Sequence, residues 1–200
     1  MRSARSMGRI IVCLLLLFSI SSPLSGFAEE KPKNFEQLDQ KTAKQCRDEV
    51  VRRFENLVRF GKLTDAQLFD TFYIPIPNTY PQKYHTQYDK VLDGALQSLL
   101  DSYLRRNSRF VFVVVTDANG YLPTHNSKFS QPLTGNKEVD AKKNRTKLIF
   151  DDRTGLAAAR NTDDYLLQQY LRDTGETMYD LSVPIFIRGR HWGCVRIGYK

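Results

Sequence analysis

Residues 41–62 alternate apolar and charged positions with a helical period. Apolar residues that recur every three to four positions lie on one face of a helix, so this segment is predicted to be an amphipathic helix that packs on a core. Gly61 is placed to end it. The apolar positions are Ala43, Cys46, Val50, Phe54, Leu57 and Val58. Cys46 is therefore expected to point toward the core.

Two further helices are predicted downstream. Thr64 and Gln67 have capping-box spacing, which starts a short second helix. Residues 73–84 contain three prolines and are predicted to cross the domain as an extended segment without regular structure. A third helix is predicted within 84–107, long enough to lie across a sheet. Its apolar stripe is Tyr88, Val91, Leu92, Ala95, Leu99 and Tyr103.

From Arg109 onward the pattern changes to that of strands and turns. Residues 110–118 are apolar on both alternations, which predicts a central strand with both faces covered. The following Asn119-Gly120 pair is a hairpin turn signal and predicts a return through residues 121–126.

The last segment, 165–200, is predicted to form three strands joined by tight turns at 173–176 and 188–190. In the middle strand one alternation is apolar, whereas the other carries Asp180 and Ser182. This split suits a sheet whose apolar face packs on the long helix and whose other face lines a partly polar cavity. The fold class is therefore predicted to be α/β of the α+β kind, with helices on an antiparallel sheet of about five strands.

The N-terminus resembles a secretory signal. Arg2, Arg5 and Arg9 precede an apolar run, and Gly26 and Ala28 are the small residues that a signal peptidase accepts, so residues 1–28 are predicted to be a signal peptide. A retained membrane anchor is the competing interpretation, but the run is shorter than the ~20 residues that span a bilayer. The mature chain is expected to be exported into an oxidising compartment.

The charge and the cysteines bear on three possible properties: nucleic-acid binding, a disulfide and covalent haem. Cleavage would remove three arginines and no acid, so the net charge of +8 would become 8 − 3 = +5. The basic residues of the mature chain are dispersed along the sequence, which argues against a nucleic-acid partner. Cys46 and Cys194 would remain, and the sequence leaves open whether they form a disulfide or stay as two buried thiols. They do not begin a CxxCH motif, so covalent haem is excluded and no cofactor is expected.

Four segments carry a family resemblance: "YIPIPNTYPQKYHT" (73–86), "NGYLPTHNSKFSQPLTG" (119–135), "NRTKLIFD" (144–151) and "RDTGE…DLSVPIFIRGRHWGCVRIGY" (172–199). In this order they resemble the extracytoplasmic Cache domain, the PAS-like sensory module of methyl-accepting chemotaxis proteins and sensor kinases. The resemblance spans Leu63 to Tyr199. It divides the chain into the signal peptide, an N-terminal helical segment (29–62) and a single Cache domain (63–200).

The resemblance implies a periplasmic sensory domain that binds a small molecule and takes part in signal transduction or chemotaxis. The chain reaches Lys200 without a following membrane helix or signalling coiled coil. Output is therefore expected through a partner, a membrane-bound kinase or chemoreceptor, with a homodimer formed through the N-terminal helices. The alternatives are an accessory or assembly protein that binds protein through its PAS-like surface, and a small hydrolase.

Three candidate ligand-binding residues lie on or just after the expected hairpin return: Tyr121, His125 and Asn126. Tyrosine and histidine offer flat surfaces with a polar tip, and asparagine both donates and accepts hydrogen bonds. The alternative is that His125 and Asn126 bind the backbone of their own loop.

Three more candidates come from later segments. Arg145 could hold a carboxylate through two parallel hydrogen bonds, or pair with Asp151, Asp152 or Asp180. Asp180, on the polar alternation of its strand, should meet either an arginine of this protein or a ligand amine. Tyr170 is a candidate aromatic wall, whereas Trp192 is better explained by core packing.

No enzymatic motif is present. The three histidines lack metal-ligand spacing, and the chain has no HExxH, no GxSxG and no glycine-rich phosphate loop. The protein is therefore predicted not to be an enzyme. An open cavity lined by Arg145, Asp180 and Tyr121 would favour sensing over the accessory role, and a closed apolar one would favour the reverse.

Overall fold

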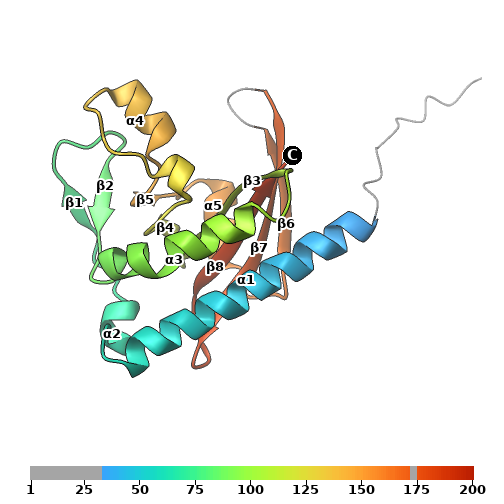
Figure 1. Ribbon diagram of the computed structural model, residues 1–200, viewed down its shortest axis with the longest axis horizontal. Helices are drawn as coiled ribbons and strands as arrows, with labels where there is room; N and C mark the ends of the chain where they lie inside the picture. Colours follow the sequence, from blue (N-terminus) through green and yellow to red (C-terminus); the bar gives the residue numbers. More distant parts are fainter. Residues whose placement is uncertain (1–32, 172–174) are drawn as a thin grey trace, which may run out of the picture. The chain divides into compact units, whose positions relative to one another are not determined.

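The computed structural model describes residues 33–171 and 175–200 (Figure 1). The predicted signal peptide and part of the predicted turn at 173–176 lie outside the described residues. The described residues form one compact unit, which includes the N-terminal helix. The helices are α1 (Lys33–Arg59), α2 (Asp65–Leu68), α3 (Asp89–Leu104), the 3-10 turn η1 (Ser127–Phe129), α4 (Lys137–Lys143) and α5 (Arg153–Arg160). The strands are β1 (Ile74–Ile76), β2 (Lys83–His85), β3 (Phe110–Asp117), β4 (Tyr121–Leu122), β5 (Leu148–Ile149), β6 (Leu166–Leu171), β7 (Thr177–Ile187) and β8 (Arg190–Tyr199).

The main sheet is antiparallel and has the strand order β3-β8-β7-β6. The predicted α+β class is confirmed, although this sheet has four strands where about five were expected. The prediction that residues 110–118 form a central strand was wrong, because β3 lies at the edge. Its apolar character on both alternations reflects coverage of both faces: Val113 and Val115 belong to the core on the helix side, while Phe112 and Val114 line a cavity on the other.

Two further sheets of two strands each accompany the main sheet, β1-β2 and β4-β5. The prediction that residues 73–84 lack regular structure was wrong, since β1 and β2 pair with Ile74 opposite His85 and Ile76 opposite Lys83. Two of the three prolines fall between the strands, where no ladder hydrogen bond is needed. The Asn119-Gly120 turn is present, with Gly120 at a φ of +80°. Its return strand β4, however, pairs with β5 rather than with β3.

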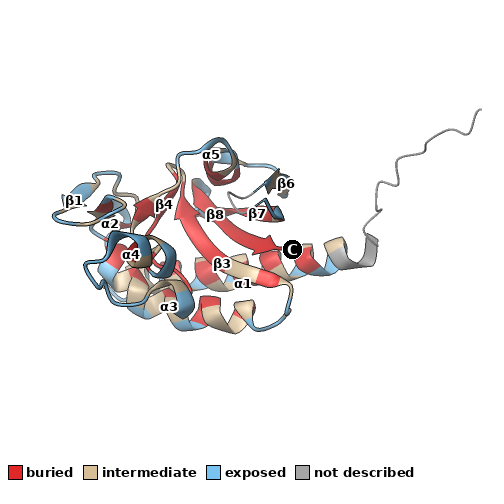
Figure 2. Ribbon diagram, turned by 90° about the horizontal axis from the view of Figure 1, so that it is seen from above, coloured by how far each residue is buried: buried red, intermediate tan, exposed pale blue. Residues whose placement is uncertain are grey.

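The helices α1 and α3 cover one face of the sheet, and α5 lies on the other (Figure 2). In α1 the predicted core positions Ala43, Cys46, Val50 and Phe54 are all fully buried. Gly61 follows the helix at a φ of +68°, and its N–H donates to the carbonyl of Val58. The capping box that begins α2 is also present. These local predictions are confirmed.

Cys46 and Cys194 are separate thiols. Cys46 lies on the buried face of α1, whereas Cys194 lies on β8 beside the hydroxyl of Thr116, at an Oγ1–Sγ distance of 3.4 Å. Burial raises the pKa of the Cys194 thiol to about 12, so it stays protonated at neutral pH. The structure therefore shows two buried thiols and no disulfide between Cys46 and Cys194.

Candidate functional site

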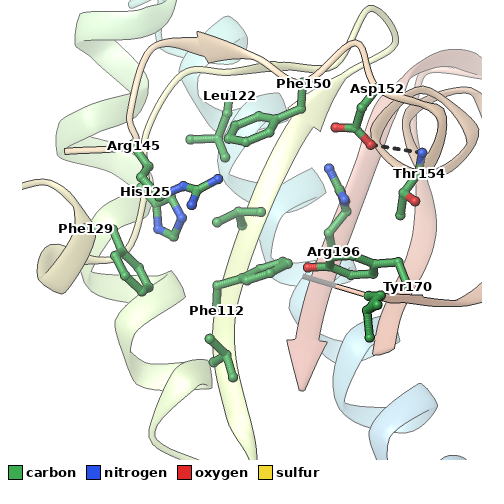
Figure 3. Close-up of a pocket in the computed structure, with 13 residues that line it drawn as sticks. Phe112, Leu122, His125, Phe129, Arg145, Phe150, Asp152, Thr154, Tyr170 and Arg196 are labelled. Carbon is green, nitrogen blue, oxygen red and sulfur yellow. Dashed lines mark hydrogen bonds between the residues drawn. The ribbon is translucent and has the colours of Figure 1, made fainter. Parts of the chain in front are cut away.

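A cavity of about 340 Å³ lies over the face of the sheet that α1 and α3 leave uncovered (Figure 3). The strands β3, β8 and β6 supply its floor, and the segments after β4, α4 and β5 supply its walls. In Figure 3, Arg145 and His125 lie together on one side and Arg196 and Tyr170 on the other, with Phe112 between them. The lining residues are Val111, Phe112, Val114, Leu122, His125, Phe129, Arg145, Phe150, Asp152, Thr154, Tyr170, Leu171 and Arg196.

A glycine makes room for the aromatic floor of the cavity. Gly198 on β8 lies directly opposite Phe112 on β3. A Cβ atom on residue 198 would lie only 2.1 Å from the Phe112 ring. The ring therefore rests on bare backbone at this position, and the glycine sets the depth of the cavity.

A buried ion pair forms the polar part of the floor. Of its two residues, only Asp180 was singled out from the sequence. Arg196 donates to both carboxylate oxygens of Asp180, from Nη2 to Oδ2 at 2.5 Å and from Nε to Oδ1 at 3.3 Å. Burial alone would lower the pKa of Arg196, but the Asp180 carboxylate outweighs it and raises this pKa above its usual value. Asp180 thus meets an arginine of this protein and lies behind Arg196, not among the lining residues.

His125 lines the cavity as a neutral ring. Its side chain is buried, and Nδ1 accepts the N–H of Asn126 at 2.7 Å, which requires an unprotonated nitrogen. Its ring lies against Phe129, with 4.8 Å between the centroids. Burial lowers the pKa of His125 to about 3, helped by the positive charges of Arg145, Lys128 and Lys83.

This depressed pKa predicts a defined acid sensitivity. The unfolded chain takes up a proton on His125 below pH ~6.5 and the folded protein only below about 3, so stability falls as the pH falls through this window. Between pH 7 and pH 4.5, this difference in the pKa of His125 should lower the free energy of unfolding by about 2 to 3 kcal/mol. His125→Asn keeps an acceptor for the Asn126 N–H and should remove most of this loss. Urea unfolding at both pH values measures it, and equal acid sensitivity of the two proteins would contradict the assignment.

Asn126 holds the rim of the cavity and does not line it. It is fully buried, and its Oδ1 accepts the N–H of Val113 at 2.9 Å, while its Nδ2 donates to Asp101 at 3.3 Å. The amide side chain thereby satisfies a backbone group that edge strand β3 would otherwise leave without a partner. Asn126 therefore ties β3 and α3 to the rim, whereas the alternative weighed above was a bond to the backbone of its own loop.

Tyr121 is placed in the core and not in the cavity. It is fully buried, and its hydroxyl donates to the carbonyl of Tyr84 at 2.8 Å. Trp192 is likewise a core residue, as expected: its indole N–H donates to the carbonyl of Leu68 at 2.8 Å, and its ring packs edge-on against Phe54. The turn after β3 points Tyr121 toward the helices, which a hairpin pattern alone does not reveal.

Arg145 and Tyr170 are both brought to the cavity. The guanidinium carbon of Arg145 lies 5.6 Å from the centre of the Phe150 ring. Asp152, one of its anticipated partners, caps α5 by accepting the N–H groups of Thr154 and Gly155, each at 3.0 Å. The cavity therefore combines an arginine at its rim with aromatic surfaces on several sides.

Several lining residues were not predicted from the sequence. Phe112, Phe129, Phe150 and Arg196 were not singled out. Arg196 had a usable signal, because it stands between apolar Val195 and Ile197 and must face away from the core if those two face it. The phenylalanines had none, since an aromatic residue in a loop or an apolar strand is indistinguishable from core before the fold is known.

No protein-family model matches the chain, and a search of curated proteins finds no match. Among solved structures, the chain is similar to an extracellular ligand binding receptor from Desulfohalobium retbaense, with 16% identity, a TM-score of 0.39, and coverage of 80% of this chain and 24% of that one. It is also similar to the sensory domain of the Campylobacter jejuni chemoreceptor Tlp3, with 13% identity, a TM-score of 0.47, and coverage of 83% and 53%. A third is the ligand binding domain of the Pseudomonas aeruginosa amino acid chemoreceptor PctC in complex with GABA, with 15% identity, a TM-score of 0.35, and coverage of 84% and 64%.

The chain thus spans about a quarter to two thirds of the length of these structures. Two of these structures are described as the sensory or ligand binding domain of a chemoreceptor, and one as an extracellular ligand binding receptor. Among the described residues, no helix combines the length and the apolar character that crossing a membrane requires.

Proposed function

We propose that this protein is an exported sensory domain whose small-molecule ligand occupies the cavity over the sheet. The observation that carries the proposal is the cavity itself, which has the size of a small-molecule site, aromatic walls and a few convergent polar groups. Arg145 is half-buried at its rim, so the cavity reaches the surface. The order of Cache-like motifs along the chain supports the same function.

The walls of the cavity are tied to α3, which offers a route for output. Gln97 Nε2 donates to the carbonyl of His125 at 3.3 Å, and Asp101 accepts the N–H of Ser127 at 3.0 Å. On its other side, α3 bonds to α1 through the Tyr103 hydroxyl, which donates to Glu49 at 2.8 Å. A ligand that displaces His125 would shift α3 against α1. We propose that α1 carries this movement to a membrane-bound kinase or chemoreceptor, or across a homodimer, in the periplasm.

The accessory role and catalysis are less well supported. A protein-binding accessory subunit would be expected to fill its cavity with its own side chains, whereas this cavity is open, with Arg145 at its rim. Asp180 and Tyr121, the other two residues named for an open sensing cavity, do not line it. For catalysis, His125 would have to act as a base, but its Nδ1 is occupied by a backbone N–H.

The proposal is tested by ligand screening of residues 29–200, which hold the whole described fold. We expect at least one compound among carboxylates, amines, amino acids and purines to raise the Tm. Val111→Trp, which places a large side chain at a half-buried lining position, should abolish that shift. Gln169→Trp, at an exposed strand position outside the lining, is the matched control. A panel without any stabilising compound, or a shift that survives Val111→Trp, would sink the proposal.

A further inference from the structure

A buried lysine that the proposed function has not used lies beside the cavity. Lys83 on β2 is 3% exposed. Its ammonium donates to the main-chain and side-chain oxygens of Asn144, both at 2.9 Å, and to the carbonyl of Thr146 at 2.7 Å. Within the described part of the chain, all of these acceptors are neutral.

Burying the Lys83 ammonium group among neutral acceptors lowers the stability of the folded protein. A buried charge without a carboxylate partner loses its hydration and recovers only part of it from carbonyl groups. Burial, together with the neighbouring charges of Lys147 and Arg145, lowers the pKa of Lys83 to about 8, against an opposing effect of Asp140. A group that costs stability and lies beside a cavity is a candidate for function.

The contacts of Lys83 fix the segment that carries Arg145. The two residues whose carbonyls it binds, Asn144 and Thr146, stand on either side of Arg145 in sequence. The Arg145 N–H donates to the carbonyl of Phe129 at 2.7 Å, and the Thr146 hydroxyl donates to the carbonyl of Pro123 at 3.0 Å. The backbone from which the guanidinium reaches the cavity is thus held from several sides, with Lys83 as its largest buried anchor.

The charges around the cavity favour an anion. Within the part of the chain that the structure describes, Asp180 pairs with Arg196 and Asp152 accepts two backbone N–H groups. Arg145 and Lys83 both repel a proton from His125, which places a positive potential at that end of the cavity. This potential would repel a ligand ammonium and attract a ligand carboxylate.

The apolar surfaces favour a flat ligand. Phe112 forms the floor, Phe129 and Phe150 form walls at the Arg145 end, and Tyr170 closes the opposite side. Aromatic rings pack well against such faces in stacked or edge-on geometry, and a guanidinium binds a carboxylate through two parallel hydrogen bonds. A volume of about 340 Å³ limits the ligand to a compact molecule.

We propose that Lys83 is a specificity-determining residue of this cavity: it holds the segment that carries Arg145, and the two cations together select a compact aromatic carboxylate over an amine. This inference rests on the proposed function, since it names the ligand class of the same cavity. Lys83 acts through Arg145 and through its charge, and it does not itself line the cavity.

Binding is measured by calorimetry with three probes of one shape: benzoate, benzamide and benzylamine. We expect the wild-type protein to bind benzoate at least about tenfold more tightly than benzylamine. Lys83→Met should weaken benzoate binding about tenfold and benzamide binding less than about twofold. In an Arg145→Met background the loss of benzoate affinity should be smaller, because only the effect of the Lys83 charge remains. Lys142→Met, at an exposed lysine of α4, is the matched control. Equal losses for benzoate and benzamide, or equal wild-type affinity for benzylamine, would overturn the selectivity.

A second measurement needs no ligand. Amide hydrogen exchange of residues 144–147 should accelerate at least about tenfold in Lys83→Met and remain unchanged in Lys142→Met. Lys83→Gln, which keeps a donor without the charge, should restore protection but not benzoate selectivity. Unchanged exchange in Lys83→Met overturns the inference whether or not any compound binds. A wild-type protein that binds none of the three probes overturns the aromatic ligand class, and the broader panel then decides the proposed function.

Discussion

Replacing Arg196 with methionine should lower the free energy of unfolding by about 3 to 5 kcal/mol at pH 7. The variant leaves Asp180, which is fully buried, without the guanidinium that donates to both of its oxygens. An uncompensated buried carboxylate either stays charged at high cost or takes up a proton, and both reduce stability. Urea unfolding followed by circular dichroism measures the loss.

The matched control replaces both partners. Arg196→Met combined with Asp180→Leu removes the charge together with its partner, and should recover most of the stability, because an apolar pair has no desolvation cost. If the single variant loses less than about 1 kcal/mol, the carboxylate has another partner and the ion pair is not what holds the floor of the cavity.

The second large effect is expected from Gly198→Ala. The added Cβ would lie 2.1 Å from the Phe112 ring, so the ring must move into the cavity or the two strands must separate. Such overpacking costs about 1 to 3 kcal/mol. The displaced ring also reduces the cavity, and we expect the affinity for benzoate to fall at least about tenfold. Thermal unfolding and calorimetry measure the two effects.

Two variants separate the ring collision from a general effect of alanine. Gly94→Ala lies within α3, where no atom stands within 4 Å of the added Cβ, and should be neutral or stabilising. Phe112→Leu added to Gly198→Ala removes most of the ring and should restore stability. A Gly198→Ala protein of wild-type stability with Phe112 in its original position would contradict the account of the floor.

The sequence predicted best what depends on local periodicity. The core face of α1, the end of that helix at Gly61 and the capping box of α2 follow from the spacing of residues within a few turns, and each is confirmed. The place of β3 in the sheet was wrong, because an edge strand covered on both faces has the same pattern as a central one. Which strand β4 pairs with depends on β5, 26 residues further along, and no local signal gives it.

For the candidate site, the sequence predicted which segments surround the cavity better than which side chains line it. His125, Arg145 and Tyr170 line the cavity, and the other three candidates support it from behind: Tyr121, Asn126 and Asp180. Tyr121 and Asn126 turn inward where the chain leaves β3. Asp180 lies on β7, between two strands of the floor, but behind the side chain of Arg196. Lys83 could not be found, because its acceptors lie 61 and 63 residues away in the chain.

The central claim is that a compact aromatic carboxylate binds in the cavity over the face of the sheet that α1 and α3 leave uncovered. It is tested most directly by a crystal of residues 29–200 soaked with 4-bromobenzoate, since the anomalous signal of bromine locates the ring without ambiguity. We predict a bromine peak within the cavity, between Phe112 and Tyr170, with the carboxylate toward Arg145. A bromine peak elsewhere on the protein, or an empty cavity in crystals saturated with the compound, would contradict this account.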